Sequence, residues 1–313
     1  MQRRQFLHNS AVTASSLLLP SAVLGQTRAG NELKIPPQLT GETANNRALY
    51  RLTVGRGSSQ FLPGVTTPTL GINGDYLGPT IRLRRGDDVS MAVLNEIGED
   101  TTLHWHGLHV PASADGGPHQ VITPGNTWHA NFTVDQDAGT FWYHSHLAGE
   151  TGRQVYLGLS GMLIIDDEPS TALELPTEYG VDDIPLVVQD RAFNADGSFA
   201  YGGAMMDTML GAFGDTVLVN GTVNPYFAPA TRKVRFRLLN ASNARTYNFA
   251  FSDNRVMQQI ACDGGLLSNP LEMRRLELAP GERCEVIADF SDGQPVDLVS
   301  LPMAADSPFM PRG

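Results

Sequence analysis

One pattern occurs twice in this chain of 313 residues, and the repeat limits the possible folds more than any other feature. In each half an Asn-Gly turn precedes an apolar run that ends in asparagine, and a Pro-Gly pair precedes a later apolar run. These elements are Asn73-Gly74, Asn95 and Pro124-Gly125 in the first half, and Asn220-Gly221, Asn240 and Pro280-Gly281 in the second. Internal repetition predicts two copies of one folding unit. We therefore expect two domains of the same fold.

The short apolar runs between turn signals predict an all-β chain. Val, Ile, Leu and Thr fill these runs, and 32 glycines and 20 prolines separate them, while long amphipathic heptads are absent. With 41% hydrophobic residues, the chain can bury two cores. We predict tandem β-sandwiches over residues 46–168 and 181–313, joined by an acidic, proline-containing linker at 169–180.

The second copy lacks a counterpart of the last strand of the first copy. A β-type run, Gly161–Ile165, closes the first copy about fifteen positions after its last histidine, but the chain stops soon after Leu301. The tail 304–313 holds two prolines and does not alternate like a strand. We expect that the last strand of the second copy is missing and that the sequence is the N-terminal part of a longer protein.

Two His-x-His pairs, His104-Trp105-His106 and His144-Ser145-His146, are the strongest chemical signal. Alternation along a β-strand directs both imidazoles of a pair to one face. At about 3.3 Å per residue the paired rings start about 6.6 Å apart, a spacing that suits ligands of adjacent ions in a cluster. Unrelated structural histidines are the less favoured reading, because both pairs have the same spacing. A polynuclear metal site is predicted.

Ligand type alone leaves zinc, copper, iron and nickel open, because imidazole suits all four. The residues after the first pair, Gly107–Val110, lack the glutamate that follows the His-x-His of cupins, and the His-x-His-x-Asp-His motif of binuclear zinc hydrolases is also absent. Copper is therefore favoured. The remaining histidines and a methionine cluster are expected to be structural or at the surface: His109, His119, His129, Met205, Met206 and Met209.

The N-terminal 29 residues have the layout of a removable export signal. Arg3-Arg4 and Phe6-Leu7 resemble the core of a twin-arginine signal, and the apolar stretch that follows is far shorter than the roughly 20 residues of a membrane-spanning helix. We expect a periplasmic or otherwise exported protein. Its net charge of −11 argues against binding to nucleic acid or anionic lipid.

The two cysteines, Cys262 and Cys284, are too few for a disulfide scaffold or a thiolate cluster. In an oxidising compartment they could pair, and the alternative is two buried free thiols in neighbouring strands. The sequence leaves both possibilities open.

Three segments resemble the first domain of a multicopper oxidase: Thr102–Leu108, Ala114–Pro118 and Trp142–His146. Further similarity extends over nearly all of the chain after the signal, and the copper efflux oxidases of the bacterial periplasm are the nearest relatives we recognise. The resemblance implies cupredoxin-type Greek-key sandwiches. It also implies a family arrangement of three such domains, with a trinuclear copper cluster between the first and the third.

The resemblance also implies roles for individual residues. His104 corresponds to the type 2 copper ligand, while His106, His144 and His146 correspond to type 3 ligands. Asp115 corresponds to the acidic residue that assists proton delivery to reduced oxygen. The alternative for Asp115 is an ordinary Asp-Gly turn.

The chain departs from the family pattern because the type 1 copper ligands of the third domain, a cysteine flanked by histidines among them, do not occur in it. We predict a laccase-like enzyme that oxidises cuprous ion or a phenol and reduces O2 to water with four electrons, with this chain inactive until a C-terminal cupredoxin domain joins it. The alternative is an exported protein that sequesters copper without catalysis. Completion of the cluster between subunits would need both ligand sets in each chain, and copper-free structural relatives, such as cell-division proteins, lose the ligands.

Overall fold

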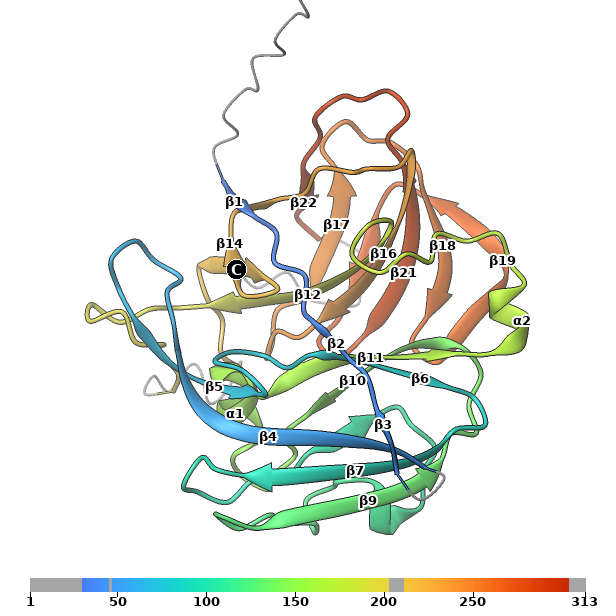
Figure 1. The fold of residues 1–313 in the computed structure, drawn as a ribbon. Helices are drawn as coiled ribbons and strands as arrows, with labels where there is room; N and C mark the ends of the chain where they lie inside the picture. The colour runs from blue at the N-terminus through green and yellow to red at the C-terminus, as the bar shows by residue number, and fades with distance from the viewer. Residues whose placement is uncertain (1–29, 45–46, 203–210, 304–313) are drawn as a thin grey trace, which may run out of the picture.

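A computed structural model describes residues 30–44, 47–202 and 211–303. The chain forms two β-sandwiches that pack on each other, the first below the second in Figure 1. The all-β tandem arrangement is as predicted. The export signal, the methionine cluster and the tail 304–313 lie outside the described residues. Among the described helices, none is long and apolar enough to span a membrane.

The first sandwich has two five-stranded sheets, one with β5 added to the order β3-β4-β7-β9 and the other with the order β2-β6-β11-β10-β8. The strands are β2 (Gln38–Leu39), β3 (Glu42–Ala44), β4 (Arg47–Ser59), β5 (Thr67–Ile72), β6 (Thr80–Arg84), β7 (Asp88–Asn95), β8 (His104–His106), β9 (Thr127–Thr133), β10 (Gly139–His144) and β11 (Ser160–Asp166). The helical segments are η1 (Ala112–Ala114), α1 (Thr151–Leu157) and α2 (Glu168–Thr171).

The second sandwich has a seven-stranded sheet of order β14-β13-β12-β16-β21-β18-β19, a three-stranded sheet of order β20-β17-β22, and the separate pair β1-β15. Its strands are β1 (Asn31–Glu32), β12 (Asp183–Arg191), β13 (Thr216–Val219), β14 (Thr222–Val223), β15 (Pro225–Tyr226), β16 (Lys233–Asn240), β17 (Tyr247–Phe251), β18 (Met257–Cys262), β19 (Gly265–Met273), β20 (Leu276–Leu278), β21 (Arg283–Asp289) and β22 (Leu298–Ser300). The N-terminal strand β1 thus reaches across to the second sandwich (Figure 1).

The repeated asparagines make equivalent hydrogen bonds in both sandwiches. Asn73 and Asn220 both adopt left-handed backbone conformations, with φ of 54° and 50°. The Asn73 side chain accepts a hydrogen bond from the Thr53 amide at 2.7 Å, and the Asn220 side chain accepts one from the Val187 amide at 2.8 Å. Each asparagine therefore ties a turn to the first long strand of its sandwich, which is why the Asn-Gly pair recurs.

Each sandwich encloses its own apolar core, and a third apolar cluster joins the two. Strand alternation buries Val89, Met91 and Val93 completely inside the first sandwich. In the third cluster, Trp142 and Met162 of the first sandwich pack with apolar residues of β12 and β16. Because this contact is apolar and buried, it fixes the position of one sandwich against the other.

The two cysteines are free thiols that face each other in register on the adjacent strands β18 and β21. Cys284 is buried, and burial raises its pKa to about 12. Cys262 is exposed, so the two cysteines are neither a disulfide nor the alternative of two buried thiols.

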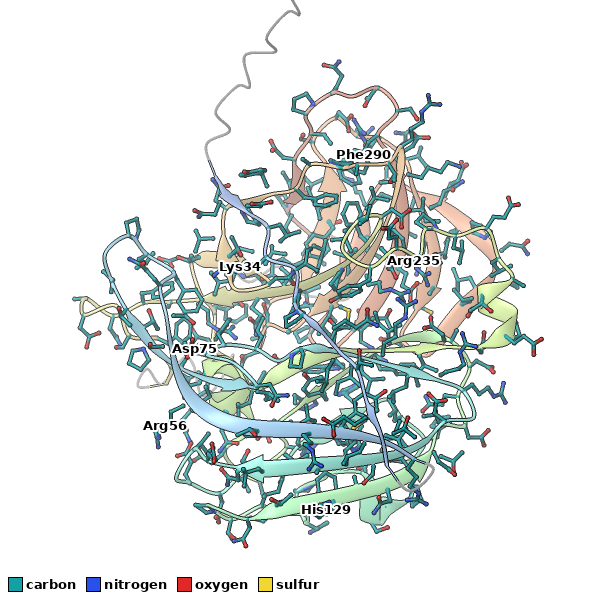
Figure 2. All side chains as sticks on the ribbon, in the orientation of Figure 1. Lys34, Arg56, Asp75, His129, Arg235 and Phe290 are labelled. Atoms are coloured by element: carbon teal, nitrogen blue, oxygen red, sulfur yellow. The ribbon has the colours of Figure 1, made fainter. Side chains whose placement is uncertain are left out.

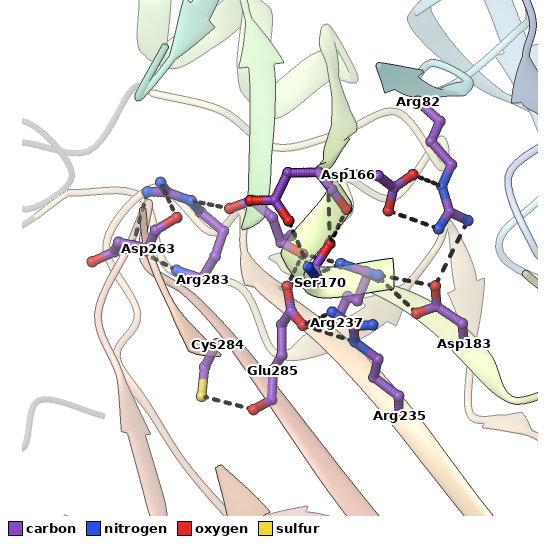
Figure 3. Close-up of polar contacts among 12 residues, drawn as sticks. Arg82, Asp166, Ser170, Asp183, Arg235, Arg237, Asp263, Arg283, Cys284 and Glu285 are labelled. Atoms are coloured by element: carbon purple, nitrogen blue, oxygen red, sulfur yellow. Dashed lines mark hydrogen bonds and ion pairs between the residues drawn. The ribbon is translucent and has the colours of Figure 1, made fainter. Parts of the chain in front are cut away.

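A buried network of ion pairs also crosses the contact between the sandwiches (Figure 3). The Arg237 guanidinium donates to Asp183 at 2.6 Å and to Glu285 at 2.9 Å, and all three side chains are almost fully buried. Thr140 of the first sandwich donates to Glu285 at 2.7 Å. Burial raises the pKa of Glu285, but the charges of Arg237 and Arg235 outweigh it, so the pKa is lowered overall. The carboxylate is therefore held in its charged form.

We predict that Arg237→Met lowers the free energy of unfolding by about 3 to 5 kcal/mol, because it removes the central cation from two buried carboxylates. Asp183 then keeps only Arg82, at 3.9 Å, and Glu285 keeps only Arg235. The matched control is Arg51→Met, which removes a surface pair with Glu42 and should cost about 1 kcal/mol or less. Urea unfolding followed by circular dichroism measures both. Equal effects of the two substitutions would contradict this account.

Candidate metal centre

The pairing of β8 with β10 brings the predicted histidines together. The two strands are antiparallel, and their register places His144 opposite His104 and Trp142 opposite His106. Trp105, between the first two histidines, points into the core and is fully buried. Alternation therefore sends His104 and His106 to the other face, where β10 presents His144.

The four rings form one group. Ring centroids of the two sequence pairs, His104 with His106 and His144 with His146, are both 5.8 Å apart. Across the strands, His104 lies 5.5 Å from His144 and 5.2 Å from His146. One ligating nitrogen from each of His104, His106 and His144 lies within 4.8 Å of the others. His146 adjoins this set of three and is not part of it.

The imidazoles of His106 and His144 are neutral at physiological pH. Burial, followed by the charge of Arg283, lowers the pKa of His106 to about 4. Burial also lowers the pKa of His144 well below its ordinary value, even though the hydrogen bond with the Ser145 carbonyl opposes the shift. Neutral imidazole is the form that binds metal ions, so these rings need not release a proton to act as ligands.

Backbone carbonyls orient two of the rings. His104 Nδ1 lies 2.9 Å from the Asp115 carbonyl oxygen, and His144 Nδ1 lies 2.7 Å from the Ser145 carbonyl oxygen. Because a carbonyl only accepts, each Nδ1 donates, and each Nε2 is unprotonated. His144 Nε2 also lies 3.1 Å from His106 Nδ1 in a hydrogen bond. Because His144 carries its proton on Nδ1, His106 Nδ1 donates and the Nε2 lone pair of His144 accepts.

Asp115 lies against the first histidine. Its carboxylate oxygen is 3.4 Å from His104 Nδ1, and its side chain is about one-third exposed, at 35%. The following Gly116 has φ of +75°, and a Cβ there would lie 1.7 Å from the Leu103 carbonyl oxygen. Glycine is therefore required at position 116 for this loop to lie against β8. An ordinary Asp-Gly turn would not need such close contact with a strand.

Side chains next to the histidines support the site, and one of them, Gln154, was not selected from the sequence. The Trp142 ring stacks on His144 at 4.0 Å. Buried Gln154 accepts hydrogen bonds from Ser145 at 2.6 Å and from Thr101 at 2.8 Å, which fixes the turn between His144 and His146. The contact between Thr101 and Gln154 joins residues 53 positions apart, so spacing could not have identified it.

The second sandwich borders the site through the turn between β20 and β21. A Cβ on Gly281 would lie 3.9 Å from His106 Cε1, and a Cβ on Gly107 would lie 3.0 Å from a guanidinium nitrogen of Arg283. Arg283 in turn donates to the Thr140 carbonyl at 3.1 Å. The second half of the chain has no histidine, but it shapes one wall of the site.

The other described histidines stand apart from this group. His109, His119 and His129 are exposed, and none of them belongs to the set of three (Figure 2 labels His129, on β9). His109 lies beyond the end of β8, which stops at His106, so strand alternation does not set its direction. The donors of the set are all imidazole nitrogens, which fit a copper ion, although zinc or iron would accept the same ligands.

The fold is a tandem of β-sandwiches, and the imidazole group on the first of them is a candidate metal site. Multicopper oxidase family models match residues 53–170 and 174–297. The chain therefore belongs to the multicopper oxidase family, and its two sandwiches are cupredoxin domains.

Curated relatives include a multicopper oxidase of Staphylococcus haemolyticus, 41% identical over 88% of this chain and 61% of its own length. They also include the cell division protein FtsP of Escherichia coli, 39% identical over 95% of this chain and 62% of its own length. The chain thus spans about 61% of the length of these relatives.

Solved structures of laccases and multicopper oxidases also superpose on this chain. The laccase of Pediococcus acidilactici superposes with a TM-score of 0.82, 39% identity and coverage of 87% of this chain and 60% of its own. The laccase-like multicopper oxidase CueO of Ochrobactrum sp. superposes with a TM-score of 0.82, 43% identity and coverage of 86% and 60%.

We predict that His144→Ala weakens copper binding by at least about tenfold, because it removes the most buried nitrogen of the set. His129→Ala, an exposed histidine on β9, is the control and should leave binding unchanged. Copper titration against a chelator of known affinity measures both. Equal affinities for the two variants would show that copper binds elsewhere.

Proposed function

We propose that this chain contributes half of a trinuclear copper centre. The observation that supports the proposal most is the grouping of His104, His106 and His144 within 4.8 Å, with His146 adjoining. In this proposal His104 is the type 2 ligand, and His106, His144 and His146 are type 3 ligands. Bound copper would supply one-electron redox chemistry, which none of these side chains provides by itself.

The chain's own residues would prepare the ligands and handle protons. The Asp115 and Ser145 carbonyls accept from the Nδ1 protons of His104 and His144, so Nε2 of each ring is unprotonated. The Asp115 carboxylate is partly open to solvent and lies beside His104. It is therefore placed to take a proton from water and hold it next to the site, as reduction of O2 to water requires.

The complete protein, in this proposal, oxidises cuprous ion or a phenolic substrate and passes four electrons to O2. Relatives named laccase and multicopper oxidase support this class of reaction. The other half of the cluster and the type 1 copper site would come from a further cupredoxin domain, since neither cysteine belongs to the imidazole group within the described residues. We further propose export by a twin-arginine-type signal at residues 1–29.

The alternative function is sequestration of copper without catalysis. The observation in its favour is that the described residues hold imidazole ligands but no second ligand group. The names of the relatives do not decide the question, because an oxidase and a cell division protein match at 41% and 39% identity. A His-Cys-His sequence encoded downstream of Gly313 would favour the oxidase, and a stop codon there would favour sequestration.

The isolated chain tests the proposed half-site. We expect it to bind copper with electron paramagnetic resonance couplings from histidine nitrogen, and to show neither blue absorption nor oxidase turnover with a phenol or cuprous ion. Turnover by the isolated chain would contradict the half-site. Absence of copper binding would contradict both the oxidase and the sequestration proposals.

For the complete oxidase, we predict that Asp115→Asn slows turnover by about 10²-fold or more, the range for loss of a positioned proton donor. Copper affinity should change little, because the backbone carbonyl that orients His104 remains. Steady-state rates and copper content measure the two effects separately. Unchanged turnover, or loss of copper in proportion to activity, would contradict the proton role.

A further inference from the structure

The two free thiols of the second sandwich have the backbone geometry of a cross-strand disulfide. Cys262 on β18 is the direct partner of Cys284 on β21 in the antiparallel register. One position further along, the Asp263 amide donates to the Arg283 carbonyl at 3.0 Å, so that pair is of the hydrogen-bonded type. Because the two types alternate, the cysteines form a non-hydrogen-bonded pair, with Cα atoms about 4.5 Å apart. A disulfide requires a Cα separation of about 4.4 to 6.8 Å.

Both thiols project from the same face of the sheet. Direct partners on adjacent strands share a face, and Cys284 belongs to the apolar core of the second sandwich. Its neighbours Arg283 and Glu285 point the other way and bind Thr140 of the first sandwich (Figure 3 labels Cys284 and both neighbours). Cys284 is buried, whereas Cys262, the last residue of β18, is exposed. One thiol is therefore open to a reagent in solvent, and the core shields the other.

The surroundings give the two thiols different parts in an exchange reaction. Burial raises the pKa of Cys284 to about 12, and the charges of Glu285 and Cys262 act in the same direction. The charge of Asp263 also raises this pKa, whereas a hydrogen bond with the Gln259 side chain lowers it. Cys284 is therefore a neutral thiol at physiological pH, and the exposed Cys262 is the thiol that reacts first.

We propose that Cys262 and Cys284 form a reversible disulfide by exchange with a low-molecular-weight or protein disulfide. The Cys262 thiolate attacks one sulfur of that disulfide, the bond between its two sulfurs breaks, and the released thiolate takes up a proton. Cys284 then gives its proton to water, attacks the Cys262 sulfur and releases the second thiol. The two cysteines lose two electrons and two protons, and the external disulfide becomes two thiols. No step requires copper.

Two features of the pair favour reversibility. The Cα separation lies near the lower limit for a disulfide, and such a strained bond is more easily reduced. The Cys262 side is exposed, so a thiol in solution can attack it. A disulfide that is buried and unstrained would instead stay oxidised.

The bond would restrain the hairpin that holds Arg283 at the wall of the histidine site. That hairpin joins β18 to β19 and begins at Asp263, directly after Cys262. Asp263 accepts hydrogen bonds from the Arg283 guanidinium, with its carboxylate at 2.9 Å and with its backbone carbonyl at 3.0 Å. Oxidation therefore fixes both strands immediately beside the ion pair of Asp263 and Arg283.

The metal-free, fully reduced chain in glutathione buffers tests the proposal. In excess oxidised glutathione we expect both thiols to disappear, with one link between the peptides that contain Cys262 and Cys284 in mass spectrometry and no glutathione retained. Excess reduced glutathione should restore both thiols. Hydrogen exchange at the Asp263 amide should slow by about tenfold or more in the oxidised chain.

Two serine variants separate the roles of the thiols. Cys284→Ser keeps the exposed thiol and should accumulate one glutathione per chain, because no second thiol displaces it. Cys262→Ser should react about tenfold more slowly or less, because its remaining thiol is buried and its pKa is raised. In the unchanged chain, closure of the internal bond should speed up about tenfold per pH unit below the pKa of Cys284, as its thiolate fraction rises. Near-ultraviolet circular dichroism checks that both variants keep the fold.

Three results would overturn the proposal. The first is an unchanged chain that retains one glutathione and a free Cys284 at equilibrium in excess oxidised glutathione. The second is a dimer linked through Cys262 in place of the internal bond. The third is an internal bond that forms only in urea, where the native register is lost.

Discussion

The register between β8 and β10 is the constraint on which the rest of the site depends. It sets His144 opposite His104, so that two sequence pairs become one group of imidazoles. A shift of one residue would turn the histidines of one strand toward the core and Trp105 or Tyr143 toward the site. Trp105 and Tyr143 are both fully buried, and their burial in the core opposes that shift. Packing on one face of the sheet thus preserves the ligand geometry on the other.

The two sandwiches carry different parts of the function in this account. The first supplies every imidazole, and the second closes one wall through Gly281 and Arg283. The position of that wall depends on the apolar cluster around Trp142 and on the buried network of Arg237 and Glu285. Since Trp142 also stacks on His144, the contact between the sandwiches and the metal centre share a side chain.

Local patterns in the sequence were enough to predict the repeat, the all-β class and the common face of His104 and His106. They did not predict that β10 ends at His144, so that a turn and not strand alternation places His146. The Asn-Gly turns succeeded as signals because Asn73 and Asn220 adopt left-handed conformations that few residues accept. Long-range contacts could not be predicted in this way. Their charge alone would assign Arg237 and Glu285 to the solvated surface, yet both side chains are buried and form an ion pair. Likewise, the support from Gln154 and the wall from Gly281 depend on tertiary packing.

X-ray absorption spectroscopy of the copper-loaded chain tests the central claim most directly, because it identifies the atoms bound to the metal. The account predicts nitrogen or oxygen neighbours with the multiple scattering typical of imidazole, and no sulfur in the first shell. A sulfur neighbour would place copper at a cysteine or methionine and would contradict a centre formed by His104, His106, His144 and His146.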